Sequence, residues 1–259
     1  LLRMYLNAME ILHLFLTRKK HNFFLKNKKI LYYMQCVVPN YFSIDSKGFF
    51  GGASYYPIKS IPETKENNFQ IIKKRIEEGN TKGPMPKRVF DEFPFKDYIL
   101  FLCQIPHDDT IKYHSNITVE EALNFVIDYC HKNEEKLLVR GHPRNRESMK
   151  SLIEICKNKK DVFYLRGGHI FDYISKSKLV CLVNSGTGLE SIIMGKKVVC
   201  FGNAEYDCVI NKADQFNYMD VIKNAKIDKN LYIKFVNYWS ELMYNIDSES
   251  SFKKLPNPD

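Results

Sequence analysis

The sequence predicts an α/β fold built around a parallel β-sheet. From Asp97 onward, short apolar segments rich in β-branched and aromatic residues alternate with longer segments of helical periodicity. The apolar segments carry few polar residues, which is typical of parallel strands that helices cover on both faces. We therefore predict a complete C-terminal Rossmann-like domain over residues 96–215.

The elements of this domain can be assigned in chain order. The predicted strands are Tyr98–Cys103, Lys136–Arg140, Val162–Leu165, Leu179–Val183 and Val198–Phe201. The predicted helices are residues 118–132, 145–158, 170–175 and a segment that starts near Ser185 and ends at Gly195. Thr118 is expected to cap the first helix, with Glu121 completing a capping box. A helical tail over residues 216–259 includes Leu231–Tyr244 and is expected to pack back on the fold.

Residues 1–95 are predicted to form a short, partial N-terminal region and a linker. Residues 1–20 have the pattern of an amphipathic helix followed by a basic run, and they lack the features of a signal peptide. We expect this helix to pack against the domain, with docking on a membrane surface as the alternative. Because the chain begins with Leu, we expect that an upstream part is missing.

A strand-like segment, Ile30–Tyr33, and a glycine-rich loop over Phe42–Ser54 follow this helix. Residues 62–95 then contain four prolines and a charged helix over about 67–78. Such a composition is typical of a linker or a crossover between domains.

The composition describes a folded protein and limits its partners. The chain has 259 residues, of which 44% are hydrophobic and 27% charged, so a disordered protein is excluded. Its net charge of +9 makes nucleic acid, phosphorylated substrates and an anionic membrane surface candidate partners. The lysines are scattered, as a compositional bias would place them, and we expect no nucleic-acid partner.

Cysteine usage indicates a reducing compartment. None of the seven cysteines forms a C-x-x-C pair, and three lie in apolar, strand-like segments. We expect reduced, buried cysteines in a cytoplasmic protein, without disulfides or a zinc site. The sequence contains no metal-binding motif and no Walker A loop. No segment reaches the roughly 18 apolar residues that span a bilayer.

Polar loops follow three of the predicted strands, and open parallel sheets bind ligands at the carboxyl ends of their strands. The first loop runs from Gln104 to Asp109 and places two adjacent carboxylates, Asp108 and Asp109, beside His107. These groups suit acid–base or nucleophilic chemistry. A turn with a helix cap is the alternative interpretation.

The second loop contains Gly141, His142, Pro143 and Arg144, and Arg140 precedes it. A histidine followed by proline and flanked by two arginines suits a phosphate or a carboxylate ligand. A histidine with a purely structural role is the alternative interpretation.

The third loop is the turn Ser185–Gly188. Small polar residues here expose backbone N–H groups at the start of the next helix, which attracts phosphate. Glu190 falls in the first turn of that helix, within reach of a ribose. The alternative is an ordinary strand-to-helix turn without a ligand. A fourth loop, Arg166–His169, is expected to shape the rim.

Together these motifs resemble the capsule polysaccharide biosynthesis family, which includes bacterial β-Kdo glycosyltransferases. The resemblance rests on Q-x-x-x-D (Gln104 and Asp108), the His142–Pro143 pair, and S-G-T-G-L-E followed by G-K-K-V-x-x-x-G. The segment Asn203–Asp207 is similar to the family's G-x-A-x-Y ending, and Ile44–Ser54 resembles the loop that precedes its nucleotide domain.

The resemblance implies a GT-B-like architecture, with two Rossmann-like domains and a cleft between them. We expect the C-terminal domain to be complete and the N-terminal part to be short or truncated. The resemblance further implies a metal-independent glycosyltransferase of capsular polysaccharide synthesis and transport that needs no cofactor and transfers Kdo from CMP-Kdo. A glycolipid or glycan acceptor at the cytoplasmic face of the inner membrane, with peripheral contact to anionic lipid, is expected.

Individual roles also follow from the resemblance. Asp108 would be the nucleophile of a retaining double displacement, in a catalytic group with Gln104 and His142, and His142 would contact the donor phosphate. The remaining positions divide into a donor-binding set and an acceptor-side loop. The donor set is Ser185, Gly186, Thr187, Gly188, Glu190, Arg140, Pro143 and Arg144, and the acceptor-side loop carries Asp45, Gly51, Gly52 and Ser54.

Two other functions remain open from the sequence. A CDP-glycerol glycerophosphotransferase-like enzyme would also use a His-Pro loop and a cytidine nucleotide. The short N-terminal region alternatively indicates an inactive nucleotide-binding fragment or a partner subunit.

Overall fold

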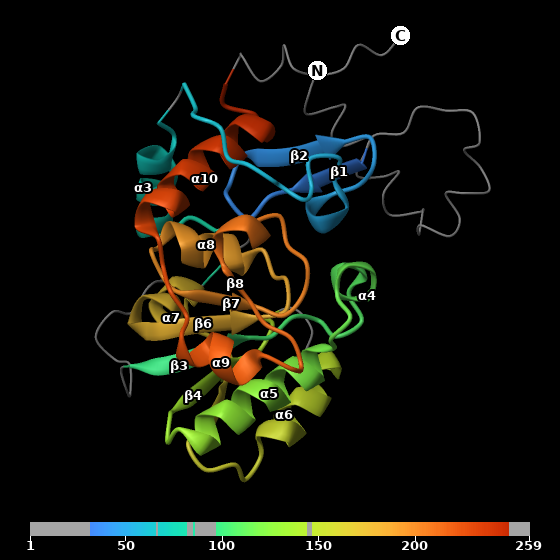
Figure 1. The fold of residues 1–259 in the computed structure, drawn as a ribbon, viewed down its shortest axis with the longest axis vertical. Coiled ribbons are helices and arrows are strands. Elements are labelled where there is room, and N and C mark those ends of the chain that lie inside the picture. The colour runs from blue at the N-terminus through green and yellow to red at the C-terminus, as the bar shows by residue number, and fades with distance from the viewer. Residues whose placement is uncertain (1–31, 66, 82–84, 86–96, 144–146, 249–259) are drawn as a thin grey trace, which may run out of the picture.

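The structure is a computed structural model that describes residues 32–65, 67–81, 85, 97–143 and 147–248 (Figure 1). Its centre is a six-stranded parallel sheet with the order β5-β4-β3-β6-β7-β8. The strands are β3 (Tyr98–Leu102), β4 (Leu137–Arg140), β5 (Val162–Leu165), β6 (Ser177–Leu182), β7 (Val198–Cys200) and β8 (Asn211–Lys212). The predicted α/β fold with a parallel sheet is confirmed, and five of these strands were predicted to within two residues.

Helices cover both faces of the sheet because its strands are apolar on both sides. In β3, Tyr98, Leu100 and Leu102 point into one core, and Ile99 and Phe101 point into the other. The first face carries α7 (Ile170–Lys176) and α8 (Thr187–Ile193), with α3 (Phe69–Glu77) and α10 (Lys229–Leu242) packed further out on α8. The opposite face carries α5 (Val119–Lys132), α6 (Lys150–Cys156) and α9 (Tyr218–Lys223).

Local signals set the ends of two helices. Thr118 caps α5 and forms the predicted capping box with Glu121, whose side chain accepts from the Thr118 backbone N–H at 2.8 Å. Gly195 follows α8 with φ of +69°, a conformation that glycine adopts without strain. Both features were predicted from sequence.

The N-terminal part forms a second, antiparallel sheet, and its first strand overlaps the predicted strand-like segment Ile30–Tyr33 at Tyr32 and Tyr33. It joins β1 (Tyr32–Gln35), β2 (Tyr41–Asp45) and β9 (Tyr244–Asn245). The predicted loop over Phe42–Ser54 is therefore wrong at its start, since its first four residues belong to β2. The pairing of Tyr41 with Asn245 joins segments far apart in the chain, which local sequence patterns do not reveal.

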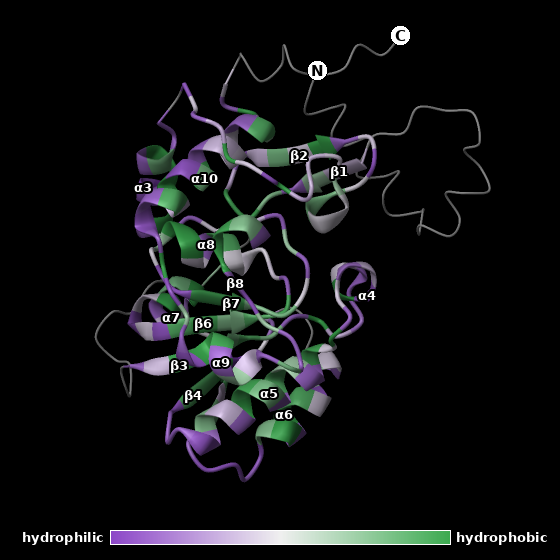
Figure 2. Ribbon diagram, viewed as in Figure 1, coloured by the Kyte–Doolittle hydropathy of each residue, from purple (hydrophilic) through white to green (hydrophobic). Residues whose placement is uncertain are grey.

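Helix α3 lies within the stretch predicted to be a linker, yet it is part of the packed body. Phe69, Ile72 and Ile76 are buried in the same core as α8 and α10. The Phe69 backbone N–H donates to the side-chain oxygen of Asn237 in α10 at 2.7 Å. Figure 2 shows the resulting division of α3 into an apolar and a hydrophilic side. The proposed domain boundaries stay predictions.

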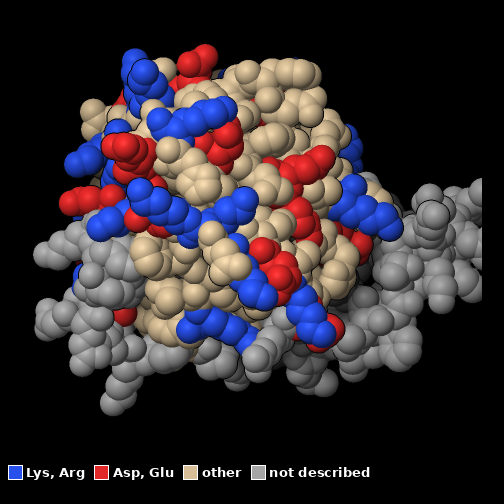
Figure 3. Space-filling view, turned by 90° about the horizontal axis from the view of Figure 1, so that it is seen from below, with Lys and Arg blue, Asp and Glu red and all other residues tan. Residues whose placement is uncertain are grey.

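Several expectations lie outside the described residues: the helix over residues 1–20, Arg144, and the last residues of the tail. Within the described part, no helix is long and apolar enough to cross a membrane. The seven cysteines are free thiols, of which Cys208 alone is exposed. On the face shown in Figure 3, basic and acidic side chains of described residues are interspersed, so their charge forms no uniformly positive surface there.

Candidate active site

The candidate active site lies where the strand order of the sheet reverses. The chain passes from β3 to β4 on one side, and returns after β5 to place β6 on the other side of β3. Ligands of open α/β sheets bind outside the carboxyl ends of the strands at such a switch point. The loops that begin there are the two that carry Asp108 and Ser185.

A pair of amide side chains joins these two loops at their base. Gln104 Nε2 donates to Asn184 Oδ1 at 2.8 Å, and the Asn184 backbone N–H donates to Gln104 Oε1 at 2.9 Å. Asn184 Nδ2 also donates to the carbonyl of Thr110 at 2.9 Å, in the short helix α4 (Asp109–His114). The geometry thus gives Gln104 a positioning role, and its predicted catalytic role stays a prediction.

Asp108 is the N-cap of α4, so a helix begins in this loop, as its alternative interpretation expected. Its Oδ1 accepts from the backbone N–H of Thr110 at 2.9 Å and from the Thr110 hydroxyl at 2.7 Å. The helix-cap interpretation is therefore correct, and it is compatible with catalysis because the cap fixes the direction of a partly exposed carboxylate. Asp109 is exposed in the first turn of the same helix.

The residues in and before the loop after β4 differ in how far they are exposed. His142 is partly buried and Pro143 is exposed, and the His142 backbone N–H lies 3.4 Å from the sulfur of Met149. Arg140 is only 3% exposed, and its guanidinium donates to the carbonyls of Gly141 and, at 3.3 Å, Gly168.

The guanidinium of Arg140 also lies 5.2 Å from the centre of the Tyr173 ring. Burial lowers its pKa. This arrangement argues against the predicted contact between Arg140 and a phosphate or carboxylate ligand, since its charge faces the backbone carbonyls of the loops after β4 and β5.

The turn after β6 is tightly packed. The Ser185 and Thr187 hydroxyls are hydrogen-bonded to each other, and the Tyr206 hydroxyl donates to the Ser185 carbonyl. A Cβ on Gly188 would lie 2.2 Å from the Tyr206 oxygen, and one on Gly186 would lie 2.3 Å from Cγ1 of Val37. Close packing therefore requires both glycines, whether or not a phosphate binds there.

Glu190 lies in the first turn of α8, as predicted, but it is only 4% exposed. Its predicted contact with a ribose stays a prediction.

Asp45 organises the acceptor-side loop. Its Oδ1 accepts backbone N–H groups of Lys47, Gly48 and Ser54 at 2.7, 3.1 and 3.0 Å, and its Oδ2 accepts the Ser54 hydroxyl. Burial alone would raise the pKa of Asp45, but these hydrogen bonds outweigh it and lower the pKa. Asp45 and Ser54 therefore stabilise the conformation of the loop through hydrogen bonds inside it.

Two of the glycines in this loop, Gly51 and Gly52, bring it against α4. A Cβ on Gly52 would lie 2.9 Å from Cε1 of His114, and one on Gly51 would lie 3.2 Å from the Asn203 carbonyl oxygen. His114 is the last residue of α4, the helix that Asp108 caps. The structure thus brings the predicted acceptor-side loop to the helix that carries the predicted nucleophile.

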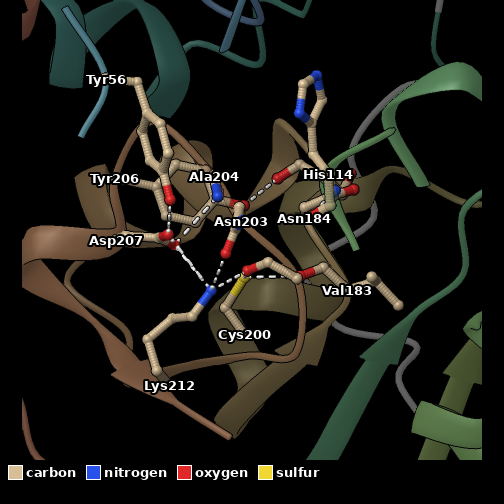
Figure 4. Close-up of polar contacts among 12 residues, drawn as sticks. Tyr56, His114, Val183, Asn184, Cys200, Asn203, Ala204, Tyr206, Asp207 and Lys212 are labelled. Atoms are coloured by element: carbon tan, nitrogen blue, oxygen red, sulfur yellow. Dashed lines mark hydrogen bonds and ion pairs between the residues drawn. The ribbon is translucent and has the colours of Figure 1, made fainter. Parts of the chain in front are cut away.

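Residues after β7 contact both the end of α4 and the Ser185 turn, and among them Lys212 was not singled out from the sequence (Figure 4). Tyr56 donates to Asp207 Oδ2 at 2.7 Å, and Lys212 Nζ forms an ion pair with Asp207 at 3.2 Å. The Asn203 backbone N–H donates to the His114 carbonyl at 2.7 Å. The resemblance of Asn203–Asp207 to the family ending was the one signal that pointed here. Among the described residues, no three His, Cys, Asp or Glu side chains are grouped to hold a metal.

Comparison with known proteins identifies the family. The model of the capsule polysaccharide biosynthesis protein family matches residues 54–244, more than half of the chain. The chain belongs to this family. The matched region contains the loops after β3, β4, β6 and β7.

Two solved structures share the fold of this family member. Both are KpsC structures from Thermosulfurimonas dismutans. The β-Kdo 2,7 transferase has a TM-score of 0.51 and 21% identity, over 83% of this chain and 70% of that chain. The β-Kdo 2,4 transferase has a TM-score of 0.60 and 16% identity, over 85% of this chain and 74% of that chain. The predicted GT-B-like class is thereby confirmed.

A relative in sequence is protein FixF of Sinorhizobium fredii (strain NBRC 101917 / NGR234). It is 29% identical over 114 residues, which are 42% of this chain and 27% of FixF. The match therefore spans about a quarter of the length of that relative.

Proposed function

We propose that this capsule biosynthesis protein is a glycosyltransferase that transfers Kdo from CMP-Kdo to a glycolipid or glycan acceptor, without a metal or cofactor. The observation that carries the proposal is that the loops with Asp108 and Ser185 begin at neighbouring strand ends, joined through Asn184, at the switch point of a fold that two β-Kdo transferases share. We place the reaction at the cytoplasmic face of the inner membrane, where a lipid-linked acceptor would be available.

The proposed reaction is a double displacement. A carboxylate oxygen of Asp108 attacks the anomeric carbon of Kdo, and the bond to the CMP oxygen breaks, so that CMP leaves with the electron pair. An acceptor hydroxyl then attacks the same carbon, the bond to Asp108 breaks, and the hydroxyl proton passes to solvent. Hydrogen bonds from Thr110 hold the carboxylate in a fixed direction for both steps.

The other predicted residues bind the donor in this proposal. The Thr187 and Gly188 N–H groups close the turn on Ser185, so the backbone N–H groups of Ser185 and Gly186, with the His142 imidazole, would stabilise the charge on the departing phosphate. Glu190 would bind the ribose. Pro143 fixes the backbone after His142. Because CMP is a good leaving group, positioning and electrostatic stabilisation supply most of the required rate enhancement.

The test compares two neighbouring carboxylates by measuring CMP release from CMP-Kdo with a glycan acceptor. We expect Asp108→Asn to lower kcat by about 1,000-fold or more while keeping the helix cap, since Asn also caps helices. Asp109→Asn should retain near wild-type activity and serves as the matched control. Activity that survives in Asp108→Asn but not in Asp109→Asn would assign the nucleophile to Asp109 instead.

A donor panel tests the substrate class. Calorimetric titration with CMP, UMP and CDP-glycerol, repeated for Glu190→Ala, should show selective CMP binding that the variant loses. Turnover of CDP-glycerol without turnover of CMP-Kdo would favour a glycerophosphotransferase. CMP binding without turnover, rescued by a longer N-terminal region or a second protein, would identify a fragment or partner subunit.

A further inference from the structure

Tyr206 packs directly against the predicted donor turn. The side chain is 1% exposed, its hydroxyl donates to the carbonyl of Ser185, and its ring occupies the space beside Gly188. The same Ser185 carbonyl accepts the Gly188 backbone N–H at 2.9 Å. The turn therefore cannot shift relative to the sheet without displacing the Tyr206 ring.

Both neighbours of Tyr206 hold the segment that follows the acceptor-side loop. Tyr55 donates to Glu205 Oε2 at 3.2 Å, and Tyr56 donates to Asp207 Oδ2 at 2.7 Å. Glu205 and Asp207, the chain neighbours of Tyr206, thus accept hydrogen bonds from two consecutive tyrosines.

Asp207 is itself fixed by further bonds. It accepts from the backbone N–H of Ala204 at 3.1 Å and from Lys212 Nζ at 3.2 Å. At the other end of the segment, Asn203 donates to the carbonyl of His114 and so reaches α4 (Figure 4). One segment of five residues, Asn203–Asp207, therefore contacts the donor turn, the acceptor-side chain and the helix that Asp108 caps.

We propose that Tyr206 is a positioning residue for the donor turn, and that the Tyr56–Asp207 hydrogen bond couples the position of this turn to docking of the acceptor-side loop. The inference rests on the proposed function for its catalytic meaning. Sugar transfer needs the carboxylate, the anomeric carbon and the acceptor hydroxyl in line, and an error of about 1 Å can cost about 100-fold in rate. The segment Asn203–Asp207, which contacts the donor turn, α4 and the acceptor-side chain, would keep these groups aligned.

The first test measures the turn itself and needs no ligand. Amide hydrogen exchange is followed at Gly188 and Leu189, whose N–H groups close the turn on Ser185 and Gly186. We expect Tyr206→Phe to speed this exchange by about threefold or more, because it removes one of two donors on the Ser185 carbonyl. Unchanged exchange at these amides would overturn the positioning role.

Tyr98→Phe is the matched control. Tyr98 is also fully buried and also donates to a backbone carbonyl, that of Tyr173 at 2.7 Å, but it lies at the amino end of β3, whereas the Ser185 turn follows the carboxyl end of β6. It should leave exchange at Gly188 and Leu189 unchanged. Equal acceleration by both variants would show a general loss of stability and would overturn the proposal.

The second test measures coupling through CMP binding and a double-mutant cycle. Tyr206→Phe should raise the Kd for CMP about three- to tenfold, the worth of one hydrogen bond, and Tyr98→Phe should not. Tyr56→Phe should raise the Kd in the same direction, and the double variant should bind no more weakly than Tyr206→Phe alone. Strictly additive effects would overturn the coupling. A wild-type chain that binds no CMP would count against the proposed function, while the exchange experiment would still decide the positioning role.

Discussion

The side chain of Gln104 forms two hydrogen bonds with Asn184, one from each partner, at 2.8 and 2.9 Å. Both residues are buried. The pair joins the carboxyl ends of β3 and β6 at the point where the strand order reverses. It therefore fixes the spacing of the two loops that carry Asp108 and Ser185.

Replacing Gln104 by Met should destabilise the fold. The change keeps the side-chain length but leaves a buried N–H and a buried amide oxygen of Asn184 without partners, at a cost of about 2–4 kcal/mol in the free energy of unfolding. Urea unfolding measures the loss. The stability of Gln104→Glu should fall between those of wild type and Gln104→Met, because a carboxylate still accepts from the Asn184 N–H but cannot donate. Gln215→Met, at an exposed position, is the control. Equal stability of the two Met variants would contradict the positioning role of Gln104.

Two glycines around α8 should respond differently to alanine. At Gly188 the added Cβ would meet the oxygen of the fully buried Tyr206 at 2.2 Å, so we expect Gly188→Ala to cost about 3 kcal/mol or more. At Gly195 nothing lies within 4 Å, and only the φ of +69° opposes the change, at about 1 kcal/mol. Thermal unfolding of both variants compares them. A smaller loss at Gly188 than at Gly195 would show that Tyr206 is free to move.

Asp45 should stabilise the acceptor-side loop in a pH-dependent way. Its folded pKa lies below its ordinary value of 3.8, so its stabilising effect is present above that pH and is lost as the pH falls through the folded pKa. Asp45→Ala should lower the free energy of unfolding at pH 7 by about 2–3 kcal/mol, since hydrogen bonds to a charged group are lost. The difference from wild type should shrink below pH 3.8. Asp220→Ala, at an exposed position, serves as the control, and a pH-independent loss for Asp45→Ala would refute the explanation.

The sequence predicted the fold where the signals are local. Each strand from β3 to β7 is an apolar segment, and the Thr118 cap and the Gly195 stop mark helix ends within a few residues. It missed the antiparallel sheet because β2 pairs with β9 near the other end of the chain. Contacts at such separation leave no periodic pattern in either segment.

For the candidate site, the strand pattern predicts where a residue lies in the fold but not which way its side chain points. Asp108 and the Ser185 turn follow the carboxyl ends of neighbouring strands, as the strand pattern predicts, and Asn184 joins the two loops through Gln104 and Thr110. Arg140 also ends a strand, but its guanidinium turns inward to backbone carbonyls and the Tyr173 ring. Whether a charged side chain faces ligand or core depends on which distant atoms lie beside it. The same reason explains why the ion pair between Asp207 and Lys212 was not predicted.

Glu205 should make the stability of the protein fall as the pH rises. Its carboxyl is 3% exposed, and burial raises its pKa to about 7, an effect that the Trp239 and Tyr55 side chains oppose in part. In the folded state the Glu205 carboxyl therefore stays protonated at pH values where the same group in the unfolded chain, with a pKa of 4.5, has lost its proton. The stabilisation is complete below the unfolded pKa and is lost as the pH rises through the folded one, by about 3 kcal/mol in total.

Glu205→Gln tests this directly, because the amide remains neutral and its oxygen still accepts from Tyr55. Urea unfolding at about pH 5 and pH 8 should give a smaller decrease in stability for the variant than for wild type. At the higher pH the variant should be the more stable of the two, since it carries no buried charge. Glu134→Gln, which changes an exposed carboxylate, should keep the wild-type dependence. If the stability of Glu205→Gln depends on pH as the wild type does, the Glu205 carboxyl is not the group that couples folding to pH in this range.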